Sequence, residues 1–174
     1  MNLVICLALA LGLSAADDRD GVRLQVVPAD QNVPSGGTVR FSLLIQNTGI
    51  APILVPASFT NMNGPAVFTT VEFFSPEGKS VPIHEMKAET LPEGHPSVAE
   101  IKAKGIKLIP NASYGFLSLA SVPEVPGKYR MRVTLHSWDP KRTSPQEVGA
   151  NVLTGIHTAS DVWVIVTPLN RTGG

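Results

Sequence analysis

Apolar and polar residues alternate along most of the chain in short runs. In these runs nearly every second residue is apolar and most residues between are polar, as in the segment 39–45. A strand with one buried face and one solvated face has this period of two, whereas a helix repeats near 3.6 residues. The alternation predicts strands at 22–26, 39–45, 67–73, 129–135 and 162–166.

Shorter apolar segments between turn residues predict further strands. Residues 53–55 lie between Pro52 and Pro56. This placement suits an edge strand, because proline cannot donate a hydrogen bond to an interior ladder. The other segments are a hairpin at 76–83 and strands at 106–108 and 116–119.

Two stretches interrupt the strand pattern. Ser97 and Glu100 have the spacing of a capping box, in which the serine hydroxyl and the glutamate carboxylate cap the first turn of a helix. They predict a short helix at 98–104 that ends at Gly105, with a strand as the alternative. Residues 139–158 are rich in turn formers and are predicted to form a long loop.

Together these elements predict an all-β fold. No regular helical crossovers are present that could connect parallel strands. The pattern therefore predicts an antiparallel β-sandwich of seven to nine strands over residues 22–168, with an insertion at 84–105. In this interpretation residues 17–21 are a polar linker and residues 169–174 a flexible tail.

Composition narrows the range of functions. The 14 Lys and Arg residues balance 14 Asp and Glu residues, and charged residues make up only 16% of the 174. A neutral chain argues against binding nucleic acid through excess positive charge. Apolar residues make up 43% of the chain, which supports a packed core over disorder.

The N-terminal residues predict export. Residues 3–13 are continuously apolar, and the small residues 14–16 precede an acidic cluster at 17–20. The apolar run is too short to span a bilayer, and the small residues suit signal peptidase. We expect a signal peptide at 1–16, cleavage after Ala16, and a periplasmic or extracellular protein with no transmembrane segment after cleavage.

Cysteine usage limits the chemistry of the exported chain. Cys6 is the only cysteine and lies within the predicted signal peptide. The mature chain would therefore hold no disulfide, no thiol nucleophile and no metal bound by cysteine. An exported domain without disulfides is more typical of bacterial than of animal proteins.

Several stretches carry motifs that a known class of domain shares. Residues 36–43 and 47–49 read as glycines, a strand and Asn-Thr-Gly, residues 126–133 enter a strand through Pro-Gly-Lys-Tyr, and 160–164 would close the fold. These motifs resemble bacterial envelope immunoglobulin-like domains of the BsuPI and CARDB types. The resemblance implies an immunoglobulin-like sandwich in which Tyr129 packs its ring inward and bonds nearby backbone through its hydroxyl. It implies no activity, because the motifs are structural.

One histidine cluster suggests a metal. His84-Glu85-Met86 resembles the His-x-Met motif of periplasmic copper chaperones of the PCuAC type, which follows an Asn-x-Gly strand such as 47–49. A neutral imidazole and a thioether suit Cu(I). The second His/Met pair of that family has no counterpart, because residues 113–117 contain neither ligand. A copper carrier that uses His84 and Met86 is therefore an alternative, while no resident cofactor is expected.

The sequence contains none of the common catalytic motifs. It has no HExxH, no G-x-S-x-G, no G-x-G-x-x-G and no P-loop. The isolated histidines His95, His136 and His157 are expected on loops or strand edges. We expect a protein that is not an enzyme, with a secreted enzyme of unidentified class as a further alternative.

The main candidate for function is an outward-facing surface. If the apolar residues of 129–135 face the core, Arg130 and Arg132 face outward. In an immunoglobulin-like order this strand lies between the strands of 67–74 and 161–167. Arginines beside aromatic rings suit a docking face, because arginine stacks on rings and both types dominate binding hot spots. The outward residues of the neighbouring strands would be Phe68, Thr70, Glu72, Phe74, Trp163 and Ile165.

Two arrangements would remove this face. The loop 139–158 or the segment 84–105 could fold over it, or a register shift in the last strand could place Trp163 in the core. The hypothesis is an exported, non-enzymatic binding module with a protein partner in the cell envelope. It would bind through its long loops or through an open sheet face formed by Arg130, Arg132, Trp163, Ile165, Phe68 and Glu72.

Overall fold

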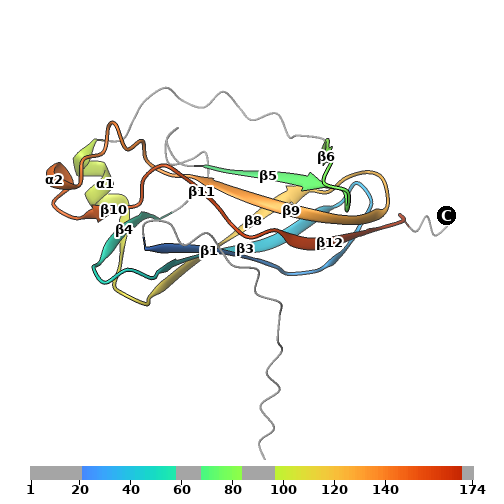
Figure 1. Ribbon diagram of the computed structural model, residues 1–174, viewed down its shortest axis with the longest axis horizontal. Helices are drawn as coiled ribbons and strands as arrows, with labels where there is room; N and C mark the ends of the chain where they lie inside the picture. The colour runs from blue at the N-terminus through green and yellow to red at the C-terminus, as the bar shows by residue number, and fades with distance from the viewer. Residues whose placement is uncertain (1–20, 58–67, 84–96, 170–174) are drawn as a thin grey trace, which may run out of the picture.

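The computed structural model describes residues 21–57, 68–83 and 97–169. Their strands form a two-layer β-sandwich with a small third sheet at one end (Figure 1). The all-β sandwich predicted from the alternation is therefore confirmed. Within the described ranges, no helix is long and apolar enough to cross a membrane.

The first layer is an antiparallel sheet of three strands in the order β1-β3-β8. These strands are β1 (Val22–Pro28), β3 (Thr38–Asn47) and β8 (Ser113–Ser121). β3 is the central strand and pairs with β1 on one side and β8 on the other.

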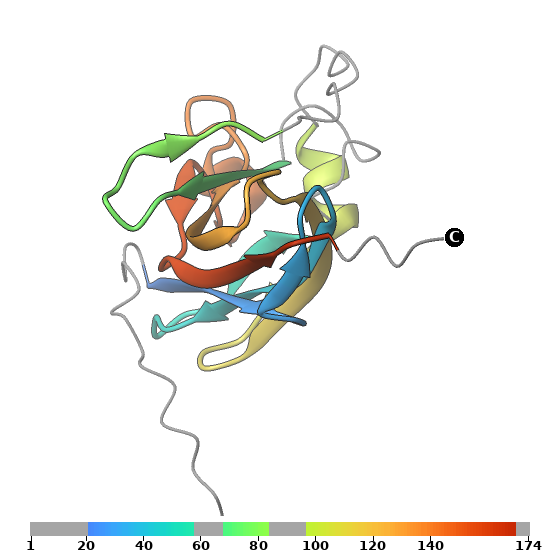
Figure 2. The same cartoon turned by 90° about the vertical axis from the view of Figure 1, so that its right-hand side faces the viewer.

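The second layer follows the order β2-β12-β9-β5-β6. Its long central strand β9 also pairs with β11, which continues the edge that β12 begins. Figure 2 shows this sheet facing the first layer across the interior. The strands are β2 (Asn32–Pro34), β5 (Phe68–Phe74), β6 (Ser80–Val81), β9 (Gly127–His136), β11 (Ile156–Thr158) and β12 (Val162–Thr167).

One end of the sandwich is closed by the third sheet and two short helices. The sheet has the order β10-β4-β7, with strands β4 (Ile53–Pro56), β7 (Gly105–Leu108) and β10 (Asn151–Val152). The helices α1 (Val98–Lys104) and α2 (Pro145–Val148) lie at the same end (Figure 1).

The core lies between the two layers, where alternate residues of β3 and β9 point inward. Burying each such side chain stabilises the fold by roughly 1.5–3 kcal/mol relative to leaving it exposed, before the cost of ordering it. The fully buried side chains of these two strands and their neighbours include Val39, Phe41, Leu43, Ile45, Phe73, Met131, Val133, Leu135 and Val164.

The local motifs form as the sequence predicted. Ser97 Oγ accepts a hydrogen bond from the Glu100 amide, and the Glu100 carboxylate accepts one from the Ser97 amide, so the capping box starts α1. The hydroxyl of Tyr129 donates to the Val125 carbonyl at 2.8 Å while its ring is buried, as expected of the tyrosine corner.

Four expectations need correction. Strand β4 is central in its sheet; its prolines are tolerated because Pro52 precedes the strand and Pro56 ends it. The segment 139–158 holds α2, β10 and β11 in place of a continuous loop. Two of the pairings, β2 with β12 and β4 with β10, are parallel. The described residues form 12 strands, more than predicted, because strands of two or three residues show no periodicity.

Candidate functional site

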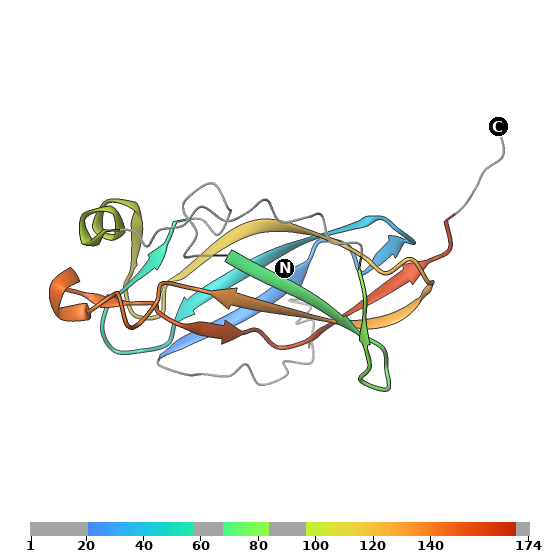
Figure 3. The same cartoon turned by 90° about the horizontal axis from the view of Figure 1, so that it is seen from above.

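The candidate site is the outer face of the second layer. We call "outer face" the outward side chains of β5, β9, β11 and β12, together with Asp161. Figure 3 shows β5, β9 and β12 side by side. The register sets rows across the strands: Phe74, Arg130 and Trp163 form one row, and Glu72 lies beside Arg132 in the next. The remaining rows join Thr70, Thr134 and Thr158, and then Phe68, His136 and Ile156.

The structure decides one alternative that the sequence left open and part of another. Trp163 points outward with 41% of its surface exposed, while Val164 next to it is fully buried, so the last strand has the expected register. Part of the segment 139–158 extends the sheet as β11 and does not cover it. Of the segment 84–105, residues 97–105 form α1 and the start of β7, and 84–96 lie outside the described residues.

Arg132 is held by a carboxylate on the same face. Its Nε donates to Asp161 Oδ1 at 2.9 Å and its Nη2 donates to Asp161 Oδ2 at 3.1 Å, a bidentate pair. Its guanidinium also lies 4.6 Å from the centre of the Phe74 ring. The hydrogen bonds with Asp161 raise the pKa of Arg132 above its ordinary value. Asp161 and Phe74 therefore fix the position of Arg132 on the outer face.

Arg130 is in a different position. Its Nη1 lies 3.7 Å from Asp161 Oδ2, which is beyond hydrogen-bond distance. Its Nε is buried and has no hydrogen-bond partner. The β5–β6 turn passes close by at Gly78, where the φ angle is +86° and an added Cβ would lie 3.3 Å from Arg130 Nη2. The fold thus holds this guanidinium in place and leaves its Nε without a hydrogen-bond partner.

Exposed apolar groups surround Arg130. Trp163 lies across from it on β12, and Lys128 Nζ lies 4.4 Å from the centre of the Trp163 ring. Ile165 follows on the same side of β12 and is 41% exposed. This half of the face therefore combines two cations, an indole ring and an aliphatic side chain.

In the other half of the outer face, which includes β11 and the start of β5, the side chains contact one another. The rings of Phe68 and His136 stack with centres 4.2 Å apart, and Thr70 Oγ1 lies 3.4 Å from His136 Nε2. Burial lowers the pKa of His136 below its ordinary value, which favours the neutral ring. Thr134 and Thr158 are joined by a hydroxyl hydrogen bond of 3.3 Å.

All six residues that the sequence singled out lie on the outer face, but their ability to bind a partner stays a prediction. Two residues that shape this face, Lys128 and Asp161, were not included. Each lies two positions before a chosen residue, Arg130 and Trp163 respectively. The period of two could have found both, because residues i and i+2 of a strand share a face.

The candidate metal ligands His84 and Met86 lie outside the described residues. Within the ranges that the structure does describe, no group of three or more His, Cys, Asp or Glu side chains is placed to hold a metal ion.

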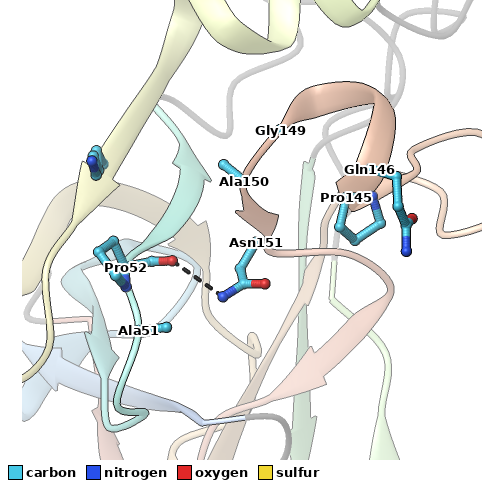
Figure 4. A pocket seen from close by; sticks show the side chains of 8 residues that line it. Ala51, Pro52, Pro145, Gln146, Gly149, Ala150 and Asn151 are labelled. Carbon is cyan, nitrogen blue, oxygen red and sulfur yellow. Dashed lines mark hydrogen bonds between the residues drawn. The ribbon is translucent and has the colours of Figure 1, made fainter.

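An open cleft of about 460 Å³ lies at the end of the sandwich that carries α2 (Figure 4). Asn151 crosses it, and its side-chain amide donates to the Pro52 carbonyl at 3.4 Å. Lys107 is the only titratable side chain among the lining residues. The cleft lining therefore contains no pair of side chains that could act as a general acid and a general base. Its lining residues are Ala51, Pro52, Lys107, Pro145, Gln146, Gly149, Ala150 and Asn151.

No protein-family model matches the sequence. A search of the curated proteins finds no match. Among solved structures, the chain is similar to the C-terminal domain of Wzt, with 9% identity and a TM-score of 0.42 over 84% of this chain and 74% of that one.

A second similar structure is a family 123 glycoside hydrolase from Clostridium perfringens, studied for glycolipid glycan hydrolysis. The identity is 9% and the TM-score 0.40, over 86% of this chain and 28% of that one, so this chain spans little more than a quarter of the enzyme. Similarity at this level leaves the function of the chain undetermined.

Proposed function

We propose that this chain is an exported, non-enzymatic binding module that docks a protein partner on the outer face through Arg130, Trp163 and Ile165. The observation that carries the proposal is a partly exposed arginine, held without a hydrogen-bonded carboxylate, beside exposed apolar side chains. The proposal that the chain is exported rests on the signal-peptide pattern of residues 1–16.

The state of Arg130 favours a ligand that brings an acceptor. A buried donor without a partner costs roughly 1–3 kcal/mol relative to a satisfied one. The buried Nε is out of a partner's reach, but the Arg130 side chain as a whole is 33% exposed, so a partner oxygen would bond to the exposed part of the guanidinium. Asp161 does not fill this role, because its nearest oxygen stays 3.7 Å from Arg130 Nη1 while both of its oxygens bond Arg132.

Trp163 and Ile165 supply the apolar part of the contact. Both are about two-fifths exposed, and the β9–β12 ladder fixes the backbone that carries them, so binding needs no backbone ordering there. Tryptophan and arginine are the residue types most enriched in binding hot spots.

The local charges point to an acidic partner segment. Asp161 bonds Arg132 and forms a looser ion pair with Arg130 at 3.7 Å. The three cations of this face, Lys128, Arg130 and Arg132, still outnumber its two carboxylates, Asp161 and Glu72. A carboxylate next to an apolar side chain on the partner would match this arrangement. We therefore expect the partner to present an aspartate or glutamate beside an apolar residue.

Affinity capture from the exported protein fraction of the native host tests the proposal. The full chain with a C-terminal tag serves as bait, beside Arg130→Glu and Trp163→Ala variants. We expect one reproducible partner, at least tenfold less of it on each variant, and an acidic residue at its contact site. Loss of one close charge pair or one buried aromatic anchor is enough for a tenfold change.

A matched control comes from the opposite layer. Arg40→Glu makes the same charge reversal on the outer side of β3, where the Arg40 side chain is 69% exposed. It should capture as much partner as the wild-type chain. Equal capture by all four baits would refute docking on the outer face, and a partner that binds equally at high salt would refute its ionic component.

A further inference from the structure

Strand β8 is an edge strand unlike the other edges of the described sheets. It is nine residues long and pairs with β3 on one side only among the described strands. Its sequence, Ser113 to Ser121, has no charged residue and no proline. Natural proteins usually protect an edge with shortness, charge or proline, and a long unprotected edge is a template for another strand.

The other edges carry such protection. β6 and β10 have two residues each, β11 has three, and β2 has three and ends at Pro34. The part of β5 that β6 leaves unpaired carries Glu72. β7 has four residues including Lys107, and β1 contains Arg23 and ends at Pro28. β8 therefore stands out as the edge open to pairing.

The backbone of β8 presents its odd-numbered residues to the open side. At the two ends of the β3–β8 ladder, the Asn47 amide donates to the Ala112 carbonyl, and the Val122 amide donates to the Gly37 carbonyl. These bonds place the even-numbered residues in the pairs that bond to β3. In an antiparallel ladder the alternate residues then direct their N–H and C=O groups away from it. Residues 113, 115, 117, 119 and 121 thus face the open edge.

The sequence of β8 is complementary to itself when it is reversed about Leu117. Antiparallel pairing of two copies about this point sets Leu119 against Gly115, Phe116 against Ser118 and Tyr114 against Ala120. Each of these pairs joins a large residue to a small one. Ser113 meets Ser121, and Leu117 meets its own copy.

The outward side chains support the same pairing. Leu117 is 78% exposed and Leu119 is 60% exposed, on the same side of the sheet. The bare surface of Gly115 is partly covered by Leu44, because an added Cβ at Gly115 would lie 2.5 Å from Leu44 Cδ2. Leu119 of a second copy would reach Gly115 and pack on Leu44. Pairing of the two strands would therefore bury a cluster of apolar side chains from both chains.

We propose that two copies of this chain pair through antiparallel β8 strands about a two-fold axis at Leu117, which joins their β1-β3-β8 layers into one six-stranded sheet. The interface is isologous, since the same residues serve on both sides. A contact of one strand pair and a small leucine cluster lies at the low end of interface size, so the dimer is expected to depend on concentration. This inference does not rest on the proposed docking function.

Single cysteines test the register, and Cys6→Ser removes the only native cysteine first. In an antiparallel bonded pair the Cα atoms are about 5.5 Å apart, within the range of a disulfide. Leu117→Cys should therefore cross-link under mild oxidation. Leu119→Cys is the matched control, because its two copies would lie four residues apart along the strands, about 13 Å. A mixture of Ser113→Cys and Ser121→Cys chains should give the mixed dimer.

A charge at the dyad tests the interface without cross-linking. Leu117→Lys sets two ammonium groups against each other and should weaken dimerisation at least tenfold in sedimentation experiments over a wide concentration range. Ile156→Lys, 68% exposed on the other layer, should dimerise like the wild-type chain. Unchanged circular dichroism and melting temperature would show that both variants fold.

Three results would overturn the proposal. A wild-type chain that is monomeric at every concentration would mean that the β8 edge is closed within the chain. Cross-linking of Leu119→Cys as fast as Leu117→Cys would refute the register. A dimer that Leu117→Lys leaves intact would place the interface elsewhere.

Discussion

At the scale of single residues, Asp161 organises the outer face. It lies between β11 and β12 and accepts two hydrogen bonds from Arg132, while Arg130 Nη1 stays 3.7 Å away. One carboxylate thus serves two neighbouring cations and bonds only one of them. Arg130 therefore gains an ion pair but no hydrogen bond from this carboxylate, and Asp161 is important for both the stability and the shape of the face.

We expect Asp161→Ala to lower the free energy of unfolding by about 1 kcal/mol. A bidentate bond to a charged group is stronger than an ordinary one, but the Arg132 side chain is 37% exposed and water screens part of the loss. Urea unfolding followed by fluorescence measures the change. Asp30→Ala is the matched control, since Asp30 is 65% exposed and pairs with Arg40 at 3.7 Å. An equal effect of both substitutions would contradict the role given to Asp161.

At the scale of elements, Asn47 holds the end of β3 against its neighbours. Its side-chain amide donates to the carbonyls of Ala51 and Leu108 at 2.9 and 3.0 Å, and its side-chain oxygen accepts from the Gly49 amide at 3.0 Å. Asn47 is almost fully buried. One side chain therefore ties β3 to the turn that follows it and to β7.

Asn47→Ala should lower the free energy of unfolding by about 2–3 kcal/mol, because it leaves buried polar groups without a partner. Denaturant unfolding monitored by circular dichroism gives this value. Gln46→Ala, one position earlier and half-buried on the outward side of β3, should change stability by less than about 0.5–1 kcal/mol. A loss below 1 kcal/mol for Asn47→Ala would show that water replaces the lost bonds.

Long strands could be predicted from the sequence, whereas the shortest strands could not. β3 and β9 were predictable because ten residues of alternation leave one register that buries the apolar side. The strands β2, β10 and β11 were not, since two or three residues carry no period and form only where a longer strand offers an edge. The outward direction of Trp163 followed from alternation. The partnerless Nε of Arg130 did not, because it depends on which cation Asp161 bonds and on the turn at Gly78.

At the scale of the whole molecule, the two proposed surfaces lie on different layers. The outer face belongs to the β2-β12-β9-β5-β6 sheet, and the β8 edge belongs to the β1-β3-β8 sheet. Pairing through β8 would therefore leave one outer face free on each copy. A dimer would then present two docking faces, and a partner with repeated sites would bind it more tightly than a single copy.

Export of the whole chain is a prediction that processing of its N-terminus tests. We expect the chain in the exported fraction of the native host to begin at Asp17, because the small residues 14–16 follow an apolar run and suit signal peptidase. Intact-protein mass spectrometry gives the N-terminus directly. Ala16→Phe places a bulky residue at the cleavage position and should leave the chain unprocessed, whereas Asp18→Asn beyond that position should not. An intact chain in the cytosolic fraction would refute export, and with it a partner in the cell envelope.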